Sequence, residues 1–288
     1  MPELPEVETI RRELAKVLIA KTIHNISSTS AKTLAPLSLK QFKKLVIGKQ
    51  IINIERRAKV LVITLSDQNH IIIHLKMTGQ LIYRPQIGKI IFGGHPQPGG
   101  LENLPNTFTR VVFDFADKSK LYFNDMRKFG WVKHIKNHER ETLFAKTGVE
   151  PLSKQFTYET FIKLLAKYPK RNLKQFLLDQ TLIAGLGNIY VDESCFLSKV
   201  LPTRIVASLK TTEKQDLYKN IITVLKLSIS KKGTSAKNYV RSDGTKGNFN
   251  TYLAVYGRAK LPCLVCGTPV TKIKSAGRGT HFCSKCQK

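Results

Sequence analysis

Four cysteines near the C-terminus constrain the fold of this chain more than any other feature of its sequence. Cys263 and Cys266 form one CxxC pair, Cys283 and Cys286 form a second, and sixteen residues separate the pairs. This spacing is typical of a structural zinc site, in which four thiolates close a tetrahedral shell and leave no position for a reactive water. Two disulfides are the alternative, which a cytoplasmic location would disfavour. We therefore expect one structural zinc ion.

The net charge predicts a polyanionic partner. Against 20 Asp and Glu stand 48 Lys and Arg, which gives a formal charge of +28 in 288 residues. Such an excess repels itself in the folded state and becomes useful against phosphates, whose neutralisation releases counterions. A membrane surface is the weaker alternative, because no strongly amphipathic basic helix is visible. No apolar run is long enough to span a bilayer and the first residues lack the layout of a secretory signal, so we expect a cytoplasmic protein.

Hydrophobic periodicity divides the chain into a β-rich part and a helical part. Helical spacing at 3–18 is followed by short alternating runs up to about 135, which predict strands. Within them, the glycines and prolines of 84–109 predict a long, mobile surface loop without regular structure. Helical spacing returns at 157–168, 172–180, 188–199 and 211–231. The expected domains are 1–135, a linker at 136–153, a helical domain at 154–232, a flexible polar loop at 233–252 and a zinc finger at 253–288.

The N-terminus offers a nucleophile. Removal of Met1 would expose Pro2 as a secondary amine, and an α-amino group has a pKa of about 8, so part of it is unprotonated at neutral pH. Such an amine attacks a sugar carbon to give an iminium, which serves as an electron sink for elimination, and Glu3 would transfer the protons. The alternative is that Glu3, Glu6 and Glu8 only stabilise the dipole of a first helical turn.

Two glycine-containing turns could bind phosphate. GLGNIYVDE at 185–193 opens a helix at Asn188, although a simple capping turn is the alternative there. Arg278, between two glycines, is expected on a tight turn that suits phosphate binding. Lys59 is expected in a strand, where a solvated lysine is the ordinary explanation. Cys195 is expected in the core, and His70, His74 and His95 receive no role.

Six motifs together resemble the bacterial formamidopyrimidine-DNA glycosylase family. They are PELPEVET at 2, RRAK at 56, HLKMTG at 74, DMRKFGW at 125, QTLIAGLGNIYVDE at 180 and the four-cysteine finger with AGRGTHFC. They cover nearly the whole chain in order. The resemblance implies a two-lobed α+β fold, in which an N-terminal helix on a β-sandwich precedes a helical lobe with a helix-two-turn-helix and a four-cysteine zinc finger.

The resemblance also implies a reaction. A protein of this family is a bifunctional DNA glycosylase and AP lyase that acts as a monomer on double-stranded DNA containing oxidised purines, such as 8-oxoguanine and formamidopyrimidines. Pro2 attacks C1′ to form a Schiff base, Glu3 handles protons, and β,δ-elimination cuts the strand. The damaged nucleotide must first leave the stack, which costs a few kcal/mol. A nucleoid-associated protein is the corresponding expectation for location.

The remaining site residues are also carried over by resemblance. Glu6 matches a carboxylate of the lesion pocket, and residues 233–252 occupy the place of the family's base-capping loop. Lys59, which belongs to the catalytic set, is a phosphate clamp together with Asn188 and Arg278. The residues that fill the gap in the DNA stack are Met77, Arg127 and Phe129, with the arginine bonded to the orphaned cytosine.

Two departures limit the transfer. PNTFT at 105–109 stands where the family has a His-Asp-His-like stretch, and Ala58 replaces a common glycine before Lys59. Two alternatives remain open. One is an endonuclease VIII-like glycosylase for oxidised pyrimidines, and the other is a non-catalytic, zinc-dependent protein that binds damaged DNA.

Overall fold

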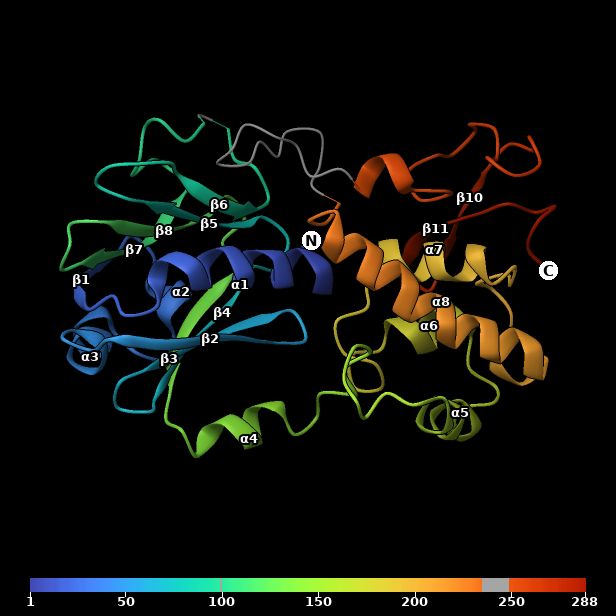
Figure 1. Ribbon diagram of the computed structural model, residues 1–288, viewed down its shortest axis with the longest axis horizontal. Coiled ribbons are helices and arrows are strands. Elements are labelled where there is room, and N and C mark those ends of the chain that lie inside the picture. The colour runs from blue at the N-terminus through green and yellow to red at the C-terminus, as the bar shows by residue number, and fades with distance from the viewer. Residues whose placement is uncertain (99, 235–248) are drawn as a thin grey trace. The chain divides into compact units, whose positions relative to one another are not determined.

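The computed structural model describes residues 1–98, 100–234 and 249–288, and its contacts divide the chain into two compact units (Figure 1). Unit 1 contains Met1–Ala145 with residues 232–234, and unit 2 contains Lys146–Lys231 and Phe249–Lys288. Among the described residues, none of the helices is both long enough and apolar enough to cross a bilayer.

Unit 1 is built on two antiparallel sheets. The five-stranded sheet has the order β1-β7-β8-β5-β6 and the four-stranded sheet the order β2-β3-β4-β9. Apolar side chains from one face of each sheet share a single core, which is the arrangement of a β-sandwich. The strands are β1 (Ile23–Ser28), β2 (Ile51–Arg57), β3 (Val60–Leu65), β4 (His70–His74), β5 (Gly79–Arg84), β6 (Ile91–Gly94), β7 (Thr109–Phe115), β8 (Lys120–Asp125) and β9 (Trp131–Ile135).

Helices cover the strand edges of the sandwich. The N-terminal helix α1 (Leu4–Leu18) contacts the edge strands β2 and β6, because its apolar residues recur every three or four positions and face one side. At the opposite edges, α2 (Ala31–Leu34) contacts β9 and α3 (Leu39–Val46) contacts β1. The predicted leading helix and the β-rich part that follows it are confirmed. The expectation of strands and loops alone from 22 to 135 is wrong at α2 and α3, because Ser38 caps α3 and its apolar residues Phe42 and Val46, four positions apart, are buried on one side of a helix.

The prediction of an irregular loop at 84–109 is wrong for part of that stretch. Ile91–Gly94 is strand β6, which pairs with β5. Apolar residues between the glycines and prolines also form a second cluster with one face of the five-stranded sheet, which consists of Ile82, Val112 and Tyr122 with Ile90, Phe92, Leu101 and Leu104. The many glycines and prolines of 84–109 predicted a loop, although apolar residues lie between them. These apolar side chains pack on the face of the five-stranded sheet that points away from the main core.

Unit 2 is helical and ends in a β-hairpin. Its helices are α5 (Tyr158–Lys167), α6 (Leu173–Leu178), α7 (Asn188–Leu197) and α8 (Thr211–Ser230), with 3-10 turns η1 (Val206–Ser208) and η2 (Phe249–Tyr252) and the hairpin β10 (Thr271–Ser275) and β11 (Arg278–Phe282). The four predicted helices are confirmed with slightly shorter ends. The expected linker contains the short helix α4 (Glu139–Phe144), and η2 replaces the end of the expected flexible loop. Residues 235–248 of that loop lie outside the described residues.

Candidate active site, DNA-contact residues and zinc-binding cluster

Pro2 and Glu3 lie directly before α1, and both are buried. Glu3 is the N-cap residue, and its backbone N–H donates to Glu6 Oε2 at 2.9 Å within a capping box. The nitrogen of Pro2 is joined to Met1 by a peptide bond, so an amine arises only when Met1 is removed. The capping box therefore fixes the direction in which the chain leaves α1 toward Pro2.

The Glu6 carboxylate also holds the segment that precedes the undescribed residues. Its Oε1 accepts hydrogen bonds from the backbone N–H and the hydroxyl of Thr234, both at 2.8 Å. A side chain at Gly233 would place its Cβ 3.0 Å from the same oxygen, and the φ of +84° also favours glycine. Both oxygens of the proposed lesion-pocket carboxylate are thus tied to backbone N–H groups of unit 1.

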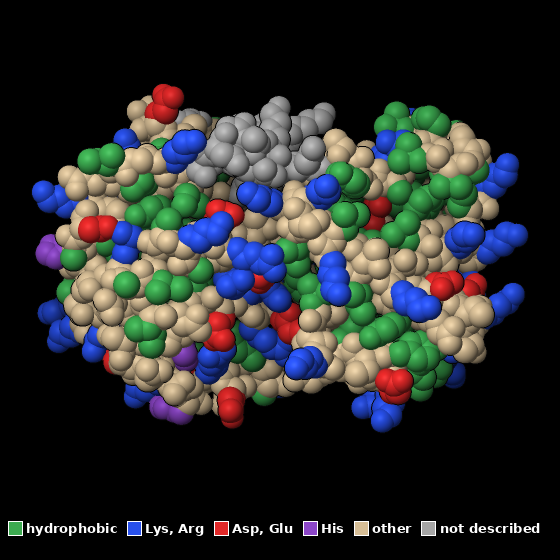
Figure 2. Space-filling view, viewed as in Figure 1, with side chains coloured by type: hydrophobic (Ala, Val, Ile, Leu, Met, Phe, Trp, Pro, Cys, Tyr) green, Lys and Arg blue, Asp and Glu red, His purple; other side chains and the backbone are tan. Residues whose placement is uncertain are grey.

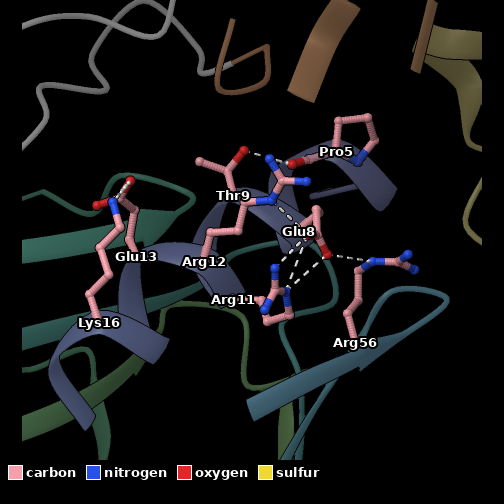
Figure 3. A network of polar contacts seen from close by, with 8 residues as sticks. All are labelled: Pro5, Glu8, Thr9, Arg11, Arg12, Glu13, Lys16 and Arg56. Atoms are coloured by element: carbon pink, nitrogen blue, oxygen red, sulfur yellow. Dashed lines mark hydrogen bonds and ion pairs between the residues drawn. The ribbon is translucent and has the colours of Figure 1, made fainter. Parts of the chain in front are cut away.

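Glu8 forms ion pairs with arginines from α1 and β2 (Figure 3). Its carboxylate accepts from Arg11 and Arg12 at 2.8 Å and from Arg56 at 3.3 Å. Burial raises the pKa of Glu8, but the hydrogen bonds from Arg11 and Arg12 and the nearby charge of Arg56 outweigh it, so the pKa lies below its ordinary value. Arg56 in addition donates to the carbonyl of Ala58 at 2.8 Å, which links α1 to the turn between β2 and β3.

Lys59 lies outside the strands, contrary to the expectation from the sequence, and it is not the solvated lysine that was the alternative to a role as a phosphate clamp. It lies in the turn between β2 and β3 and is only 6% exposed. The preceding Ala58 has a φ of 53°, in the left-handed region that favours glycine. Ala58 therefore adopts the backbone conformation that the family's common glycine would reach without strain.

Met77, Arg127 and Phe129, the residues expected to fill the gap in the DNA stack, lie on two loops of unit 1. Met77 follows β4 and is 40% exposed, while Phe129 lies between β8 and β9 and is 47% exposed. The guanidinium of Arg127 stacks on the Phe129 ring at 4.6 Å from its centroid. An apolar surface with one attached cation is therefore available on these loops.

His74, which received no role from the sequence, supports the first of these loops. Its Nδ1 accepts the backbone N–H of Lys76 at 2.9 Å. Burial, together with the charges of Lys76 and Lys59, lowers the pKa of His74 to about 3. The imidazole is therefore neutral at physiological pH, and its lone pair stays available as an acceptor.

In unit 2 the two predicted phosphate-binding turns contact each other. Ala276 and Gly277 both have positive φ angles, of 54° and 70°, and form the two-residue turn of the hairpin that carries Arg278. Asn188 is the first residue of α7, and its Nδ2 donates to the carbonyl of Gly279 at 2.9 Å. Residues 91 positions apart are thus brought together.

A buried ion pair, which the sequence did not indicate, lies beneath this contact. Lys174 in α6 and Asp192 in α7 are fully buried, with Nζ and Oδ1 2.5 Å apart. Lys174 also donates to the Gly279 carbonyl at 3.1 Å, and Asp192 Oδ2 accepts the backbone N–H of His281 at 2.9 Å. The pair therefore joins two helices to strand β11. An acidic residue that directly follows the apolar stretch Ile189–Val191 was the available signal for Asp192, whereas nothing in the sequence distinguished Lys174.

The four C-terminal cysteines fit a zinc ion. Their sulfur atoms all lie within 4.8 Å of one another, with Cys263 and Cys286 3.9 Å apart and Cys266 and Cys283 3.5 Å apart. A tetrahedron with zinc–sulfur distances of about 2.3 Å has edges of about 3.8 Å. No disulfide joins these cysteines, so the disulfide alternative is wrong, and Cys195 is buried as predicted.

Known proteins match the whole chain. Residues 1–132 match the Formamidopyrimidine-DNA glycosylase N-terminal domain, 147–239 the Formamidopyrimidine-DNA glycosylase H2TH domain, and 260–288 the zinc finger found in FPG and IleRS. Relatives named Formamidopyrimidine-DNA glycosylase are 38% identical over 288 residues in Carboxydothermus hydrogenoformans and 40% identical over 292 residues in Halalkalibacterium halodurans, with complete coverage of both chains in each pair.

Solved structures agree. The Lactococcus lactis Fpg in complex with DNA containing an abasic site has a TM-score of 0.87 and 35% identity over 99% of both chains. MutM in complex with DNA containing carbocyclic 8-oxo-G has a TM-score of 0.86 and 35% identity over the full length of both. The class defined by the fold and the cysteine cluster is thus a β-sandwich protein with an H2TH domain and a zinc finger. The chain belongs to the formamidopyrimidine-DNA glycosylase family.

Proposed function

We propose that this protein is a bifunctional DNA glycosylase and AP lyase of base-excision repair that removes oxidised purines from double-stranded DNA. The observation that carries the proposal is the Pro2-Glu3 pair at the capped start of α1, in a chain that matches the family over its full length. Relatives crystallised with abasic DNA and with 8-oxo-G analogue DNA support this substrate class.

The chemistry begins with the Pro2 amine that removal of Met1 creates. The nitrogen lone pair attacks C1′, the glycosidic bond breaks, and the base leaves with its electron pair and a proton. Displacement of the base leaves C1′ bonded to both the Pro2 nitrogen and the ring oxygen O4′. The C1′–O4′ bond then breaks, O4′ takes up a proton, and the opened sugar carries an iminium at C1′. The iminium accepts electrons when a proton is lost from C2′, so the 3′ phosphate leaves by β-elimination and the 5′ phosphate by δ-elimination. Glu3 transfers protons in these steps, because it adjoins Pro2 and its position is fixed by the capping box.

The other site residues bind and shape the DNA. Lys59, Asn188 and Arg278 bind phosphates, and Glu6 lines the lesion pocket. Met77, Arg127 and Phe129 enter the stack where the damaged nucleotide has left it. The zinc ion held by the four cysteines folds the hairpin that carries Arg278 and takes no part in the reaction.

The domain limits and the location are part of the same proposal. The catalytic sandwich comprises 1–135, the linker 136–153, the helical domain 154–232, the lesion-capping loop 233–252 and the zinc finger 253–288. A monomer on DNA, in the cytoplasm and associated with the nucleoid, fits a repair enzyme with a charge of +28.

Borohydride trapping tests the proposal. Purified protein, with Met1 removal checked by mass, is incubated with duplex DNA containing one 8-oxoguanine opposite cytosine, and the cross-link is mapped by mass spectrometry. We expect an adduct on Pro2. The Pro2→Gly variant should lose most strand cleavage while its DNA affinity stays within about twofold of wild type. An adduct on another residue, or normal turnover by the variant, would contradict the nucleophile assignment.

A second duplex, which carries an oxidised pyrimidine in place of 8-oxoguanine, tests whether the protein prefers oxidised purines or oxidised pyrimidines. A Lactococcus lactis Fpg structure with DNA containing an oxidised pyrimidine makes this comparison necessary. We expect faster excision of 8-oxoguanine. Excision of the pyrimidine alone would favour the endonuclease VIII-like alternative, and tight binding without any adduct would favour the non-catalytic one.

A further inference from the structure

One buried hydrogen-bond centre joins the two loops that carry Met77, Arg127 and Phe129. The hydroxyl of Thr78, from the loop after β4, donates to Oδ1 of Asp125, the last residue of β8. The backbone N–H of Arg127 donates to both of them, at 3.1 Å to Thr78 Oγ1 and 3.2 Å to Asp125 Oδ1. Asp125 is fully buried and Thr78 nearly so, hence water cannot replace these bonds.

The other atoms of Asp125 fix the second loop at both ends. Its Oδ2 accepts the backbone N–H of Gly130 at 2.7 Å, so one carboxylate spans the loop from Arg127 to Gly130. The position of Gly130 is tight, because an added Cβ would lie 2.6 Å from the Phe123 ring. The Asp125 carbonyl accepts from the buried Arg110 Nε at 2.7 Å.

The first loop is held from its other side. The carbonyl of Thr78 accepts from Gln97 Nε2 at 2.6 Å, and the same amide donates to the His95 carbonyl at 2.8 Å. The backbone N–H of Gly79 donates to the Leu75 carbonyl at 2.9 Å. Both loops therefore have defined backbones, and Thr78 is the side chain through which one loop bonds to the other.

We propose that Thr78 and Asp125 are positioning residues that hold the two loops in one fixed arrangement, so that Met77, Arg127 and Phe129 enter DNA as a unit and the base opposite the lesion is read accurately. This inference rests on the proposed function. Neither residue needs to touch DNA for this role. The stacking of Arg127 on Phe129 involves one loop alone, so it does not join that loop to the loop of Met77.

The test compares Thr78→Val with Thr78→Ser. Valine keeps the size of threonine but neither donates to Asp125 nor accepts from Arg127, whereas serine keeps the hydroxyl. Loss of a buried hydrogen bond to a charged group is expected to reduce the preference for cytosine over adenine opposite 8-oxoguanine about tenfold in Thr78→Val, and Thr78→Ser should restore it. Cleavage of a single-stranded abasic oligonucleotide, which has no opposite base, should stay within about twofold of wild type.

Thr64→Val is the matched control. Thr64 is also buried in unit 1, and its hydroxyl contacts His70 Nδ1 at 3.2 Å in the four-stranded sheet, outside the two loops. This variant should keep wild-type discrimination. Equal losses in Thr64→Val and Thr78→Val would reduce the effect to general destabilisation and overturn the proposal, as would unchanged discrimination in folded Thr78→Val.

Amide hydrogen exchange gives a readout that does not depend on activity. Exchange at the N–H groups of Arg127 and Gly130 should be faster in Thr78→Val than in wild type and Thr64→Val. Unchanged exchange would overturn the positioning role even if no lesion were cleaved. Absence of cleavage by the wild type, with faster exchange in Thr78→Val, would instead contradict the proposed function and leave the joined loops confirmed.

Discussion

Ala58 adopts a conformation that is costly for an L-residue, and its neighbours stabilise the turn. The carbonyl of Ala58 accepts from Arg56, and Arg56 is in turn held by Glu8 of α1 (Figure 3). A left-handed conformation costs a residue with a Cβ about 1–2 kcal/mol. The strained residue directly precedes Lys59, one of the proposed phosphate-binding residues.

Ala58→Gly should therefore stabilise the protein. The relief of strain exceeds the larger entropy that glycine adds to the unfolded chain, so we expect the free energy of unfolding to rise by about 0.5–1 kcal/mol. Urea unfolding measures the change. Ala15→Gly, near the C-terminal end of α1, is the control and should lose about 1 kcal/mol. A loss of stability in Ala58→Gly would show that the turn is not strained.

His74 should make the stability of unit 1 depend on pH. Its pKa is about 3 in the folded protein and about 6.5 when unfolded, so the unfolded state binds one more proton between these values. The free energy of unfolding therefore falls as the pH decreases below 6.5, by about 2 kcal/mol at pH 5 from this residue. This loss is only about 0.2 kcal/mol at pH 7 and vanishes at higher pH.

The difference in the free energy of unfolding between wild type and His74→Gln measures the pH-dependent contribution of His74. We expect the stability advantage of wild type at pH 7 to shrink by about 2 kcal/mol at pH 5 in urea unfolding. His24→Gln, at an exposed position of β1, controls for the loss of an imidazole. Parallel pH profiles for wild type and His74→Gln would contradict a neutral, buried His74.

At the level of elements, the hairpin β10–β11 is attached to α6 and α7 through polar contacts. The Gly279 carbonyl accepts from both Lys174 and Asn188, and Asp192 accepts from His281 of β11. Zinc folds the end of the chain, but these contacts determine where Arg278 lies relative to Asn188 within unit 2. Two proposed phosphate contacts therefore share one buried support.

Lys174→Met should destabilise unit 2 strongly. It leaves the Asp192 carboxylate buried without its cation, which costs about 3–5 kcal/mol. The double variant Lys174→Met/Asp192→Asn removes both charges, and the Asn carbonyl can still accept from His281, so it should recover at least half of the loss. Urea unfolding measures both. Arg171→Met, which breaks a partly exposed pair with Asp179, should cost about 1 kcal/mol or less. A double variant no more stable than Lys174→Met would contradict this account.

At the level of the whole molecule, the charge of +28 predicts DNA binding that weakens steeply with salt. Lys and Arg side chains are spread over the face in Figure 2, where Asp and Glu are fewer.

Arg278→Ala should weaken binding of all DNA sequences alike and lower the slope of log affinity against log salt by about one. Fluorescence anisotropy over a salt series measures the slope. Lys43→Ala, on α3 at the strand edges opposite α1, should leave it unchanged, and equal slopes in the two variants would contradict the assignment of Arg278.

The sequence alone determined the features that depend on neighbouring residues. The spacing of the four cysteines predicted the metal site, the apolar period predicted α1 and the helices α5, α6, α7 and α8 of unit 2, and the order of the motifs predicted the family. Each of these signals is contained in a short stretch of chain, and the residues of that stretch keep their relations when the chain folds.

Only the tertiary structure decided which polar groups are buried and what they bind. Lys59 is covered by its surroundings, Thr78 bonds to Asp125 across 47 positions, and Lys174 reaches the Gly279 carbonyl across 105. A pattern of residues cannot specify such partners, because each bond depends on how distant elements pack. Burial then makes these bonds selective, since a polar group removed from water must be satisfied within the protein.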